Sequence, residues 1–107
     1  MKKYLLKKTY NQCRALFCIP ESVIIDYRLE VNSDSWGCCS QVSDTHYVII
    51  INPDMSIRDT IATMIHEMTH VKQWIFPPHA SGKDNGEDEA ESVQYELTDL
   101  LWKLGLI

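Results

Sequence analysis

The segment from Ser56 to Phe76 constrains the fold of this chain more than any other part. Its apolar residues recur at steps of three and four, which places them on one face of a helix: Ile57, Ile61, Met64, Ile65, Met68, Val71 and Ile75. Ser56 and Asp59 have the spacing of a capping box, and Pro77-Pro78 cannot continue a helix. We therefore predict an amphipathic helix that ends near Phe76 and packs its apolar face against a core.

The residues before this helix predict one further helix and three strands. Residues 3–18 have apolar side chains loosely on one side and lysines opposite, and Pro20 ends the pattern. Residues 23–31 and 46–52 are rich in β-branched residues, and residues 36–42 precede the latter across Ser43-Asp44-Thr45, a hairpin signal. The run Ile49-Ile50-Ile51 indicates a strand covered on both faces, so we expect it at the centre of the sheet.

A loop and a last helix are predicted after Pro77-Pro78. Residues 79–86 contain two turn signals, Ser81-Gly82 and Asn85-Gly86. Residues 87–104 have a helical stripe that Gly105 closes: Ala90, Val93, Leu97, Leu100, Leu101 and Leu104. The order predicts a single α+β domain spanning residues 1–107, with helices on a small, mostly antiparallel three-stranded sheet.

Composition excludes several classes of protein. A chain of 107 residues has room for one small domain, and no apolar run approaches the roughly 20 residues of a membrane helix. The net charge of −5 disfavours nucleic acid as a partner. The basic start has too short an apolar stretch before Lys7-Lys8 for a secretory signal, so we expect a cytoplasmic protein. The basic residues of this first helix form a solvated face or, alternatively, dock to an acidic partner.

The four cysteines are Cys13, Cys18, Cys38 and Cys39, and none forms a Cys-x-x-Cys pair. Adjacent residues of a strand point to opposite faces, which makes it difficult for Cys38 and Cys39 to share a metal. We expect reduced cysteines that pack like small hydrophobes, with a zinc-thiolate site as the alternative.

The chemistry of the chain is concentrated in His66-Glu67-Met68-Thr69-His70, which has the form H-E-x-x-H. Histidines four apart on a helix lie one turn apart on the same face, so both can bind one ion. Neutral histidine nitrogens are zinc ligands, and Glu67 is positioned to act on a metal-bound water as a general base. The alternative is a pair of solvated surface histidines.

A tetrahedral site needs a third protein ligand, and we predict Glu87. It opens the last helix, which a helix hairpin would return to the end of the His66 helix, and it shares one face with Glu91 and Gln94. Glu91 would then accept a hydrogen bond from a ligand histidine. Spacing alone leaves Glu89, Glu91 and His79 as other candidates for the third ligand, and a helix N-terminus favours carboxylates even without a metal.

These two motifs resemble those of the gluzincin zinc metallopeptidases. His66-Glu67-Met68-Thr69-His70 followed by Glu87-Asp88-Glu89-Ala90-Glu91 is similar to the ligand pattern of their smallest members, the minigluzincins. The strand at residues 48–52 also resembles the strand before the zinc helix in SprT-like and ImmA/IrrE-type proteins. The resemblance implies a zincin-like fold, bound Zn²⁺, Glu87 as ligand with Glu91 beside it, and His79 or Tyr95 as a transition-state stabiliser.

We therefore expect a zinc-dependent peptidase acting on a peptide or protein. If residues 36–42 form the edge of the sheet, an extended substrate can add to that edge as a further strand. The chain lacks the larger C-terminal subdomain of full-size gluzincins, which leaves a second hypothesis: a zinc-stabilised, catalytically weak or inactive binding module. A hydrolase of another amide, such as a cell-wall peptide, is a third.

Overall fold

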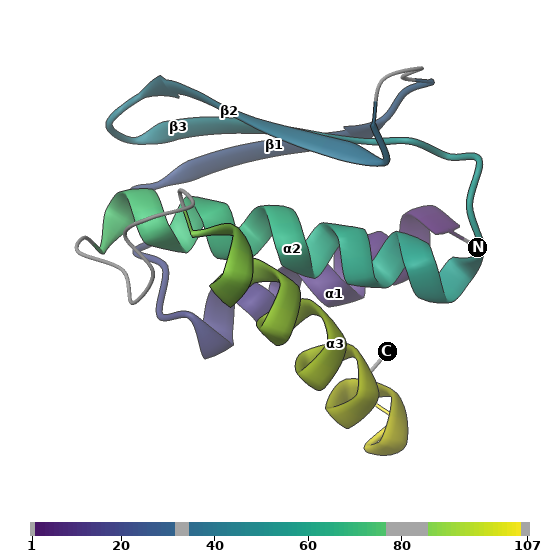
Figure 1. The fold of residues 1–107 in the computed structure, drawn as a ribbon. Helices are drawn as coiled ribbons and strands as arrows, with labels where there is room; N and C mark the ends of the chain where they lie inside the picture. The colour runs from purple at the N-terminus through teal and green to yellow at the C-terminus, as the bar shows by residue number, and fades with distance from the viewer. Residues whose placement is uncertain (1, 32–34, 77–85, 106–107) are drawn as a thin grey trace.

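The computed structural model describes residues 2–31, 35–76 and 86–105. Figure 1 shows three helices on one side of a three-stranded sheet. In chain order the elements are α1 (Lys2–Leu16), β1 (Ile24–Leu29), β2 (Gly37–Ser43), β3 (His46–Ile51), α2 (Ile57–Ile75) and α3 (Glu87–Lys103). The predicted α+β class and the order of elements are confirmed, and no described helix has the length and apolarity needed to cross a membrane.

The sheet is mixed, with the order β1-β3-β2. The central position predicted for β3 is confirmed, and so is the antiparallel hairpin that joins it to β2. The expectation of a mostly antiparallel sheet is wrong, because β1 pairs with β3 in parallel, with Ile25 opposite Tyr47. A turn signal fixes the direction of β2 relative to β3, whereas alternation within β1 fixes only which side chains share a face.

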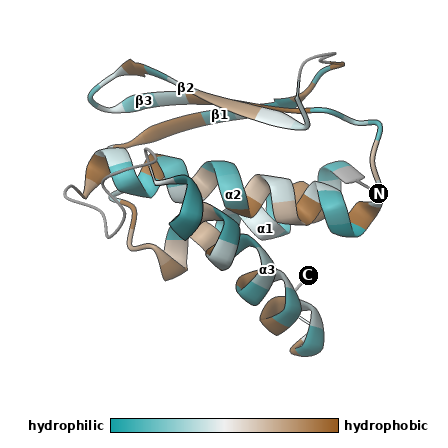
Figure 2. Cartoon of the chain, viewed as in Figure 1, coloured by the Kyte–Doolittle hydropathy of each residue, from teal (hydrophilic) through white to brown (hydrophobic). Residues whose placement is uncertain are grey.

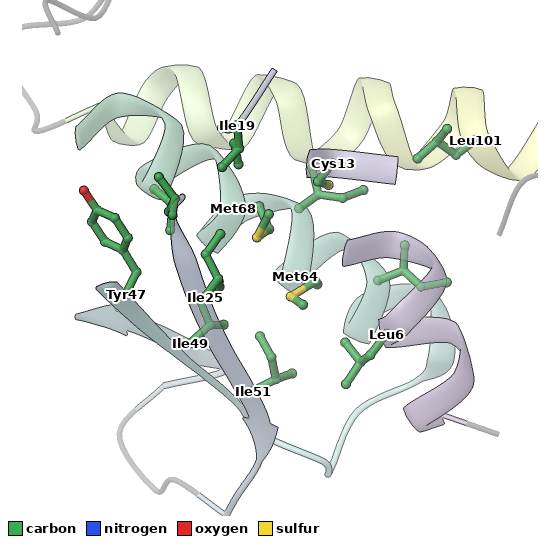
Figure 3. Close-up of a cluster of buried hydrophobic side chains, with 14 residues drawn as sticks. Leu6, Cys13, Ile19, Ile25, Tyr47, Ile49, Ile51, Met64, Met68 and Leu101 are labelled. Atoms are coloured by element: carbon green, nitrogen blue, oxygen red, sulfur yellow. The ribbon is translucent and has the colours of Figure 1, made fainter. Parts of the chain in front are cut away.

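The core lies between the sheet and the helices. Tyr47, Ile49 and Ile51 of β3 are buried on the side that faces the helices, where Figure 3 shows them in the cluster with Met64 and Met68 of α2. The intervening β3 residues are only half-buried, so the sheet has a single covered face. The Ile49-Ile50-Ile51 run therefore belongs to a central strand, as predicted, but the prediction that this strand is covered on both faces is wrong.

Helix α2 is the element around which the rest is arranged. It packs against β2 and β3 on one side and against α1 and α3 on the others, so it is buried along most of its length. The predicted cap is present, since Ser56 Oγ accepts a hydrogen bond from the backbone N–H of Asp59 at 3.1 Å. Figure 2 shows apolar and polar residues alternating along α2, and a strongly polar start of α3.

The helix ends differ little from the predictions. Helix α1 ends at Leu16, before Cys18, whose φ of 55° is incompatible with a continuing helix. Helix α3 begins after Gly86 and ends before Gly105, and both glycines have positive φ. The predicted loop at residues 79–86 lies, except for Gly86, outside the described residues, as does His79.

Candidate metal centre

Helices α2 and α3 run antiparallel, and their facing side chains meet in order along both helices. Arg58 pairs with Asp99 near the start of α2, and farther along His66 contacts Gln94 and His70 contacts Glu87. The predicted helix hairpin is thus present, and Figure 1 shows the start of α3 beside the second half of α2. Helix α2 is amphipathic, so its polar stripe lies opposite the apolar face that enters the core and is left to meet α3.

The three predicted ligands converge at this contact. His66 Nε2 and His70 Nε2 are 3.2 Å apart, and the Glu87 carboxylate lies 3.2 Å from the first and 2.8 Å from the second. The histidine side chains are 17% and 15% exposed, whereas that of Glu87 is 56% exposed. The group could therefore hold a metal ion at the edge of the helix pair, within reach of solvent.

Two glutamines hold the histidine rings. His66 Nδ1 is 2.8 Å from Gln94 Oε1, and His70 Nδ1 is 2.9 Å from Gln73 Oε1. The amide of Gln73 has a defined orientation, because its Nε2 donates to Gly86 O at 3.0 Å and to Glu89 Oε1 at 2.7 Å. Its Oε1 must then accept the proton of His70 Nδ1, so in the neutral ring the lone pair is at Nε2, which faces the centre.

The chemistry of this donor set fits a metal ion. When Nδ1 carries the proton, a neutral imidazole offers only an acceptor at Nε2, so acceptors of His66, His70 and Glu87 face one another. Such acceptors repel unless a positive charge lies between them. Ligands 2.0–2.1 Å from a tetrahedral ion are about 3.3 Å apart, and the separations here are 3.2, 3.2 and 2.8 Å.

Glu67 lies beside the three ligands but is not among them. Its side chain is buried, with 7% exposed, and within the described part of the chain no hydrogen-bond donor contacts its carboxylate. Burial raises the pKa of the Glu67 carboxyl, His66 and His70 lower it, and the Glu87 carboxylate raises it. A buried carboxylate without a donor is costly, which is typical of a functional group rather than a structural one.

Gly86 fixes the position of the Glu87 helix relative to His70. Its φ is +83°, and a Cβ atom at this position would lie 2.1 Å from Gln73 Oε1, so only glycine fits. Gln73 thus connects two ligands: its oxygen orients His70, and its nitrogen holds the backbone one residue before Glu87. Glu89 accepts the second proton of the same amide and lies 4.0 Å from Lys72 Nζ.

A cleft opens beside the metal centre, between α3 and the start of β2. Its inner part has a volume of about 330 Å³ and is lined by His66 and Glu67, with Trp36 and Tyr95 among its walls. An adjoining outer part of about 210 Å³ extends along α2 to Asp59. Gly37 permits this geometry, because a Cβ there would lie 2.7 Å from Thr63 Cγ2 where β2 approaches α2.

The other predicted site residues have different places. Glu91 lines the inner cleft, and the acceptor for His66 is Gln94, so the hydrogen bond predicted for Glu91 is wrong. Glu91 and Gln94 both lie within helical reach of the Glu87 face, but Gln94, two turns after Glu87, is the residue that meets His66, whereas Glu91 lines the cleft. Tyr95 lines the cleft as a candidate stabiliser can, whereas His79 lies outside the described residues.

Sequence reasoning missed the roles of Gln73, Gln94 and Gly86. The signal was present for the glutamines, because Gln73 lies on the polar face of α2 and Gln94 on the face of Glu87. The sequence carries no such signal for Gly86, because its role depends on its distance from Gln73 in the folded protein.

The cysteines lie outside the candidate metal group. All four are free thiols, and Cys13 is fully buried in the core. Burial raises the pKa of both Cys13 and Cys39 to about 12, and the nearby Glu67 carboxylate contributes to the rise at Cys39. Cys13 therefore packs as a small hydrophobe, as expected, whereas Cys38 and Cys39 are only half-buried and Cys18 is exposed.

No family model matches the chain, and no curated protein or solved structure matches it either.

Proposed function

We propose that this protein is a zinc-dependent metallopeptidase of the gluzincin type. The observation that carries the proposal is the convergence of His66, His70 and Glu87 with Glu67 buried beside them. Two imidazole nitrogens and one carboxylate are a common ligand set of catalytic zinc, which keeps a further position for water or substrate. When bound, zinc polarises the scissile carbonyl and lowers the pKa of a water molecule.

Glu67 is the proposed general base. Its carboxylate lines the cleft, where a peptide bond can approach, and no described donor competes for its lone pairs. The burial that raises its pKa strengthens it as a base, so Glu67 can take a proton from water and pass it to the leaving amine. Gln73 and Gln94 keep both histidines in the tautomer that binds a metal.

Substrate binding is proposed at the junction of β2 and α3. Strand β2 is an edge strand, and its start at Gly37 forms a wall of the cleft. An extended peptide paired with this edge would pass over the metal centre, its backbone held by strand hydrogen bonds. Tyr95, on the opposite wall, is the proposed donor to the carbonyl oxygen as charge develops on it.

The experiment that tests this proposal compares wild type with Glu67→Gln on a peptide library read by mass spectrometry, after both are loaded with zinc. We expect wild type to cleave and Glu67→Gln to bind zinc equally well but to lose at least about a hundredfold in rate. Glu96→Gln is the matched control, since Glu96 is on α3 outside the cleft. Cleavage that survives in Glu67→Gln contradicts the mechanism. Zinc binding without cleavage in wild type supports the binding module instead.

A further inference from the structure

The charged side chains that line the cleft are of one sign. Among the described residues that form its inner and outer parts, Asp59, Glu67 and Glu91 carry carboxylates, and none is a lysine or an arginine. Glu67 belongs to the proposed chemistry, but the other two carboxylates have no role in it. Low-dielectric walls concentrate the field of such charges, so a bound side chain would experience a negative potential.

The carboxylates of Asp59 and Glu91 are not neutralised by their neighbours. In the part of the chain that the structure describes, neither takes part in an ion pair. Arg58, next to Asp59 in sequence, instead pairs with Asp99 and stacks on Trp102, its guanidinium 5.6 Å from the ring centroid. The backbone amide of Asp59 is used by the helix cap, and Asp59 is one of the residues that line the outer cleft.

The aromatic walls fit the same kind of ligand. Trp36 and Tyr95 line both parts of the cleft and are 61% and 65% exposed, although large aromatic side chains are usually buried. An aliphatic stem can lie between two such rings, and a cation held over a tryptophan or tyrosine face is attracted by its electrons. The outer volume of about 210 Å³ is large enough for one long side chain but not for a folded segment.

We propose that the cleft selects peptides with a lysine or arginine next to the bond that lies over the metal centre. The stem of this side chain lies between Trp36 and Tyr95, and its charge reaches Asp59 at the far end, with Glu91 adding to the potential. This inference rests on the proposed function for its biological meaning. The binding preference itself depends only on the cleft.

Binding and hydrolysis are measured separately so that the two proposals can fail separately. Fluorescence anisotropy with zinc-loaded Glu67→Gln, chosen because it is expected to cleave at least about a hundredfold more slowly, measures affinity for three labelled peptides that differ at one position: lysine, norleucine or glutamate. Mass spectrometry follows cleavage of the same peptides by wild type. We expect the lysine peptide to bind about tenfold more tightly than the norleucine peptide, and the advantage to shrink as salt is raised.

Variants that remove the charge of a cleft carboxylate test whether these carboxylates cause the lysine preference. Asp59→Asn with Glu91→Gln, made in the Glu67→Gln background, should reduce the lysine advantage to about twofold or less. Glu96→Gln, which removes a charge from α3 outside the cleft, should leave it unchanged.

Equal binding of the lysine and norleucine peptides overturns this inference, and so does failure of all three to bind at millimolar concentration. A lysine preference in binding without any cleavage supports the inference and contradicts the peptidase. Cleavage without a lysine preference supports the peptidase and contradicts this inference.

Discussion

The two faces of α2 are buried in different ways. Toward the core, Ile61, Met64 and Met68 are fully buried among apolar neighbours, whereas toward α3 and the cleft the buried side chains include Glu67 and Gln73. An apolar face stabilises the fold roughly in proportion to the area it buries. On a polar face each buried donor needs an acceptor. Such a face therefore fixes where its side chains lie more than it raises the stability of the fold. We therefore expect changes on the first face to cost stability and changes on the second to cost metal affinity.

The largest expected effect is on the core face. Ile61→Ala should lower the free energy of unfolding of the metal-free protein by about 2–5 kcal/mol, because it leaves a cavity around a fully buried position. Ile57→Ala, one turn earlier and 36% exposed, is the matched control and should cost less than about 1 kcal/mol. Urea denaturation followed by circular dichroism measures both. Loss of zinc from folded Ile61→Ala with no change in its free energy of unfolding would contradict the expectation that the core face determines stability rather than metal affinity.

The next effect tests the connection between the two helices. Gly86→Ala should weaken zinc binding by about 10- to 100-fold, because the new Cβ displaces Gln73 from His70 and moves the start of α3. Gly105→Ala also places alanine at positive φ, but no atom lies within 4 Å of its Cβ, so its zinc affinity should be that of wild type. Competition with a chelating dye measures both affinities. Equal affinities for the two variants would show that Gly86 has no part in the site.

A smaller effect separates Gln94 from Glu91. Gln94→Ala removes the acceptor at His66 Nδ1 and should weaken zinc binding about tenfold. Glu91→Ala removes a cleft carboxylate that does not contact the ring, and should change the affinity less than about twofold. The same dye competition distinguishes them. A larger loss of zinc affinity in Glu91→Ala than in Gln94→Ala would instead support Glu91 as the hydrogen-bond acceptor for His66.

The smallest effect is at Cys13 of α1, which is buried in the same core, and it depends on pH. Burial raises the pKa of Cys13 to about 12, so the folded state keeps a proton that the unfolded state releases from about pH 8.5 upward. The stability contributed by this thiol is therefore present below pH 8.5 and declines above it, by about 1.4 kcal/mol per pH unit. Cys13→Ala should show a correspondingly shallower decline between pH 9 and 10 in urea denaturation. An identical decline in both proteins would mean that Cys13 ionises as freely in the folded state.

Local patterns predicted the elements and the residues of the metal group, but not how the strands and side chains pair. The stripe and cap of α2 predicted its bounds closely, and the spacing of His66 and His70 on it requires only helix geometry. The start of α3 was predicted at Glu87, where the structure begins it. These features depend on residues a few positions apart, which is the range over which sequence patterns are informative.

The errors concern contacts between segments far apart in sequence. The parallel pairing of β1 with β3 depends on where the chain returns to the sheet, which alternation within β1 does not encode. Gln94, rather than Glu91, meets His66, a contact between residues 28 positions apart. Gly86 and Gln73 are likewise 13 positions apart and come into contact only in the folded protein.

The most direct test of the account is the zinc content of purified protein by elemental analysis, comparing wild type with Glu87→Ala, Glu89→Ala, Glu91→Ala and His79→Ala. We expect about one zinc per chain in wild type and in the last three variants, with a clear loss in Glu87→Ala alone. Zinc retained in Glu87→Ala and lost in one of the others would contradict the assignment of the third ligand. A wild-type chain that holds no zinc, even after the metal is added back, would contradict the metal centre itself.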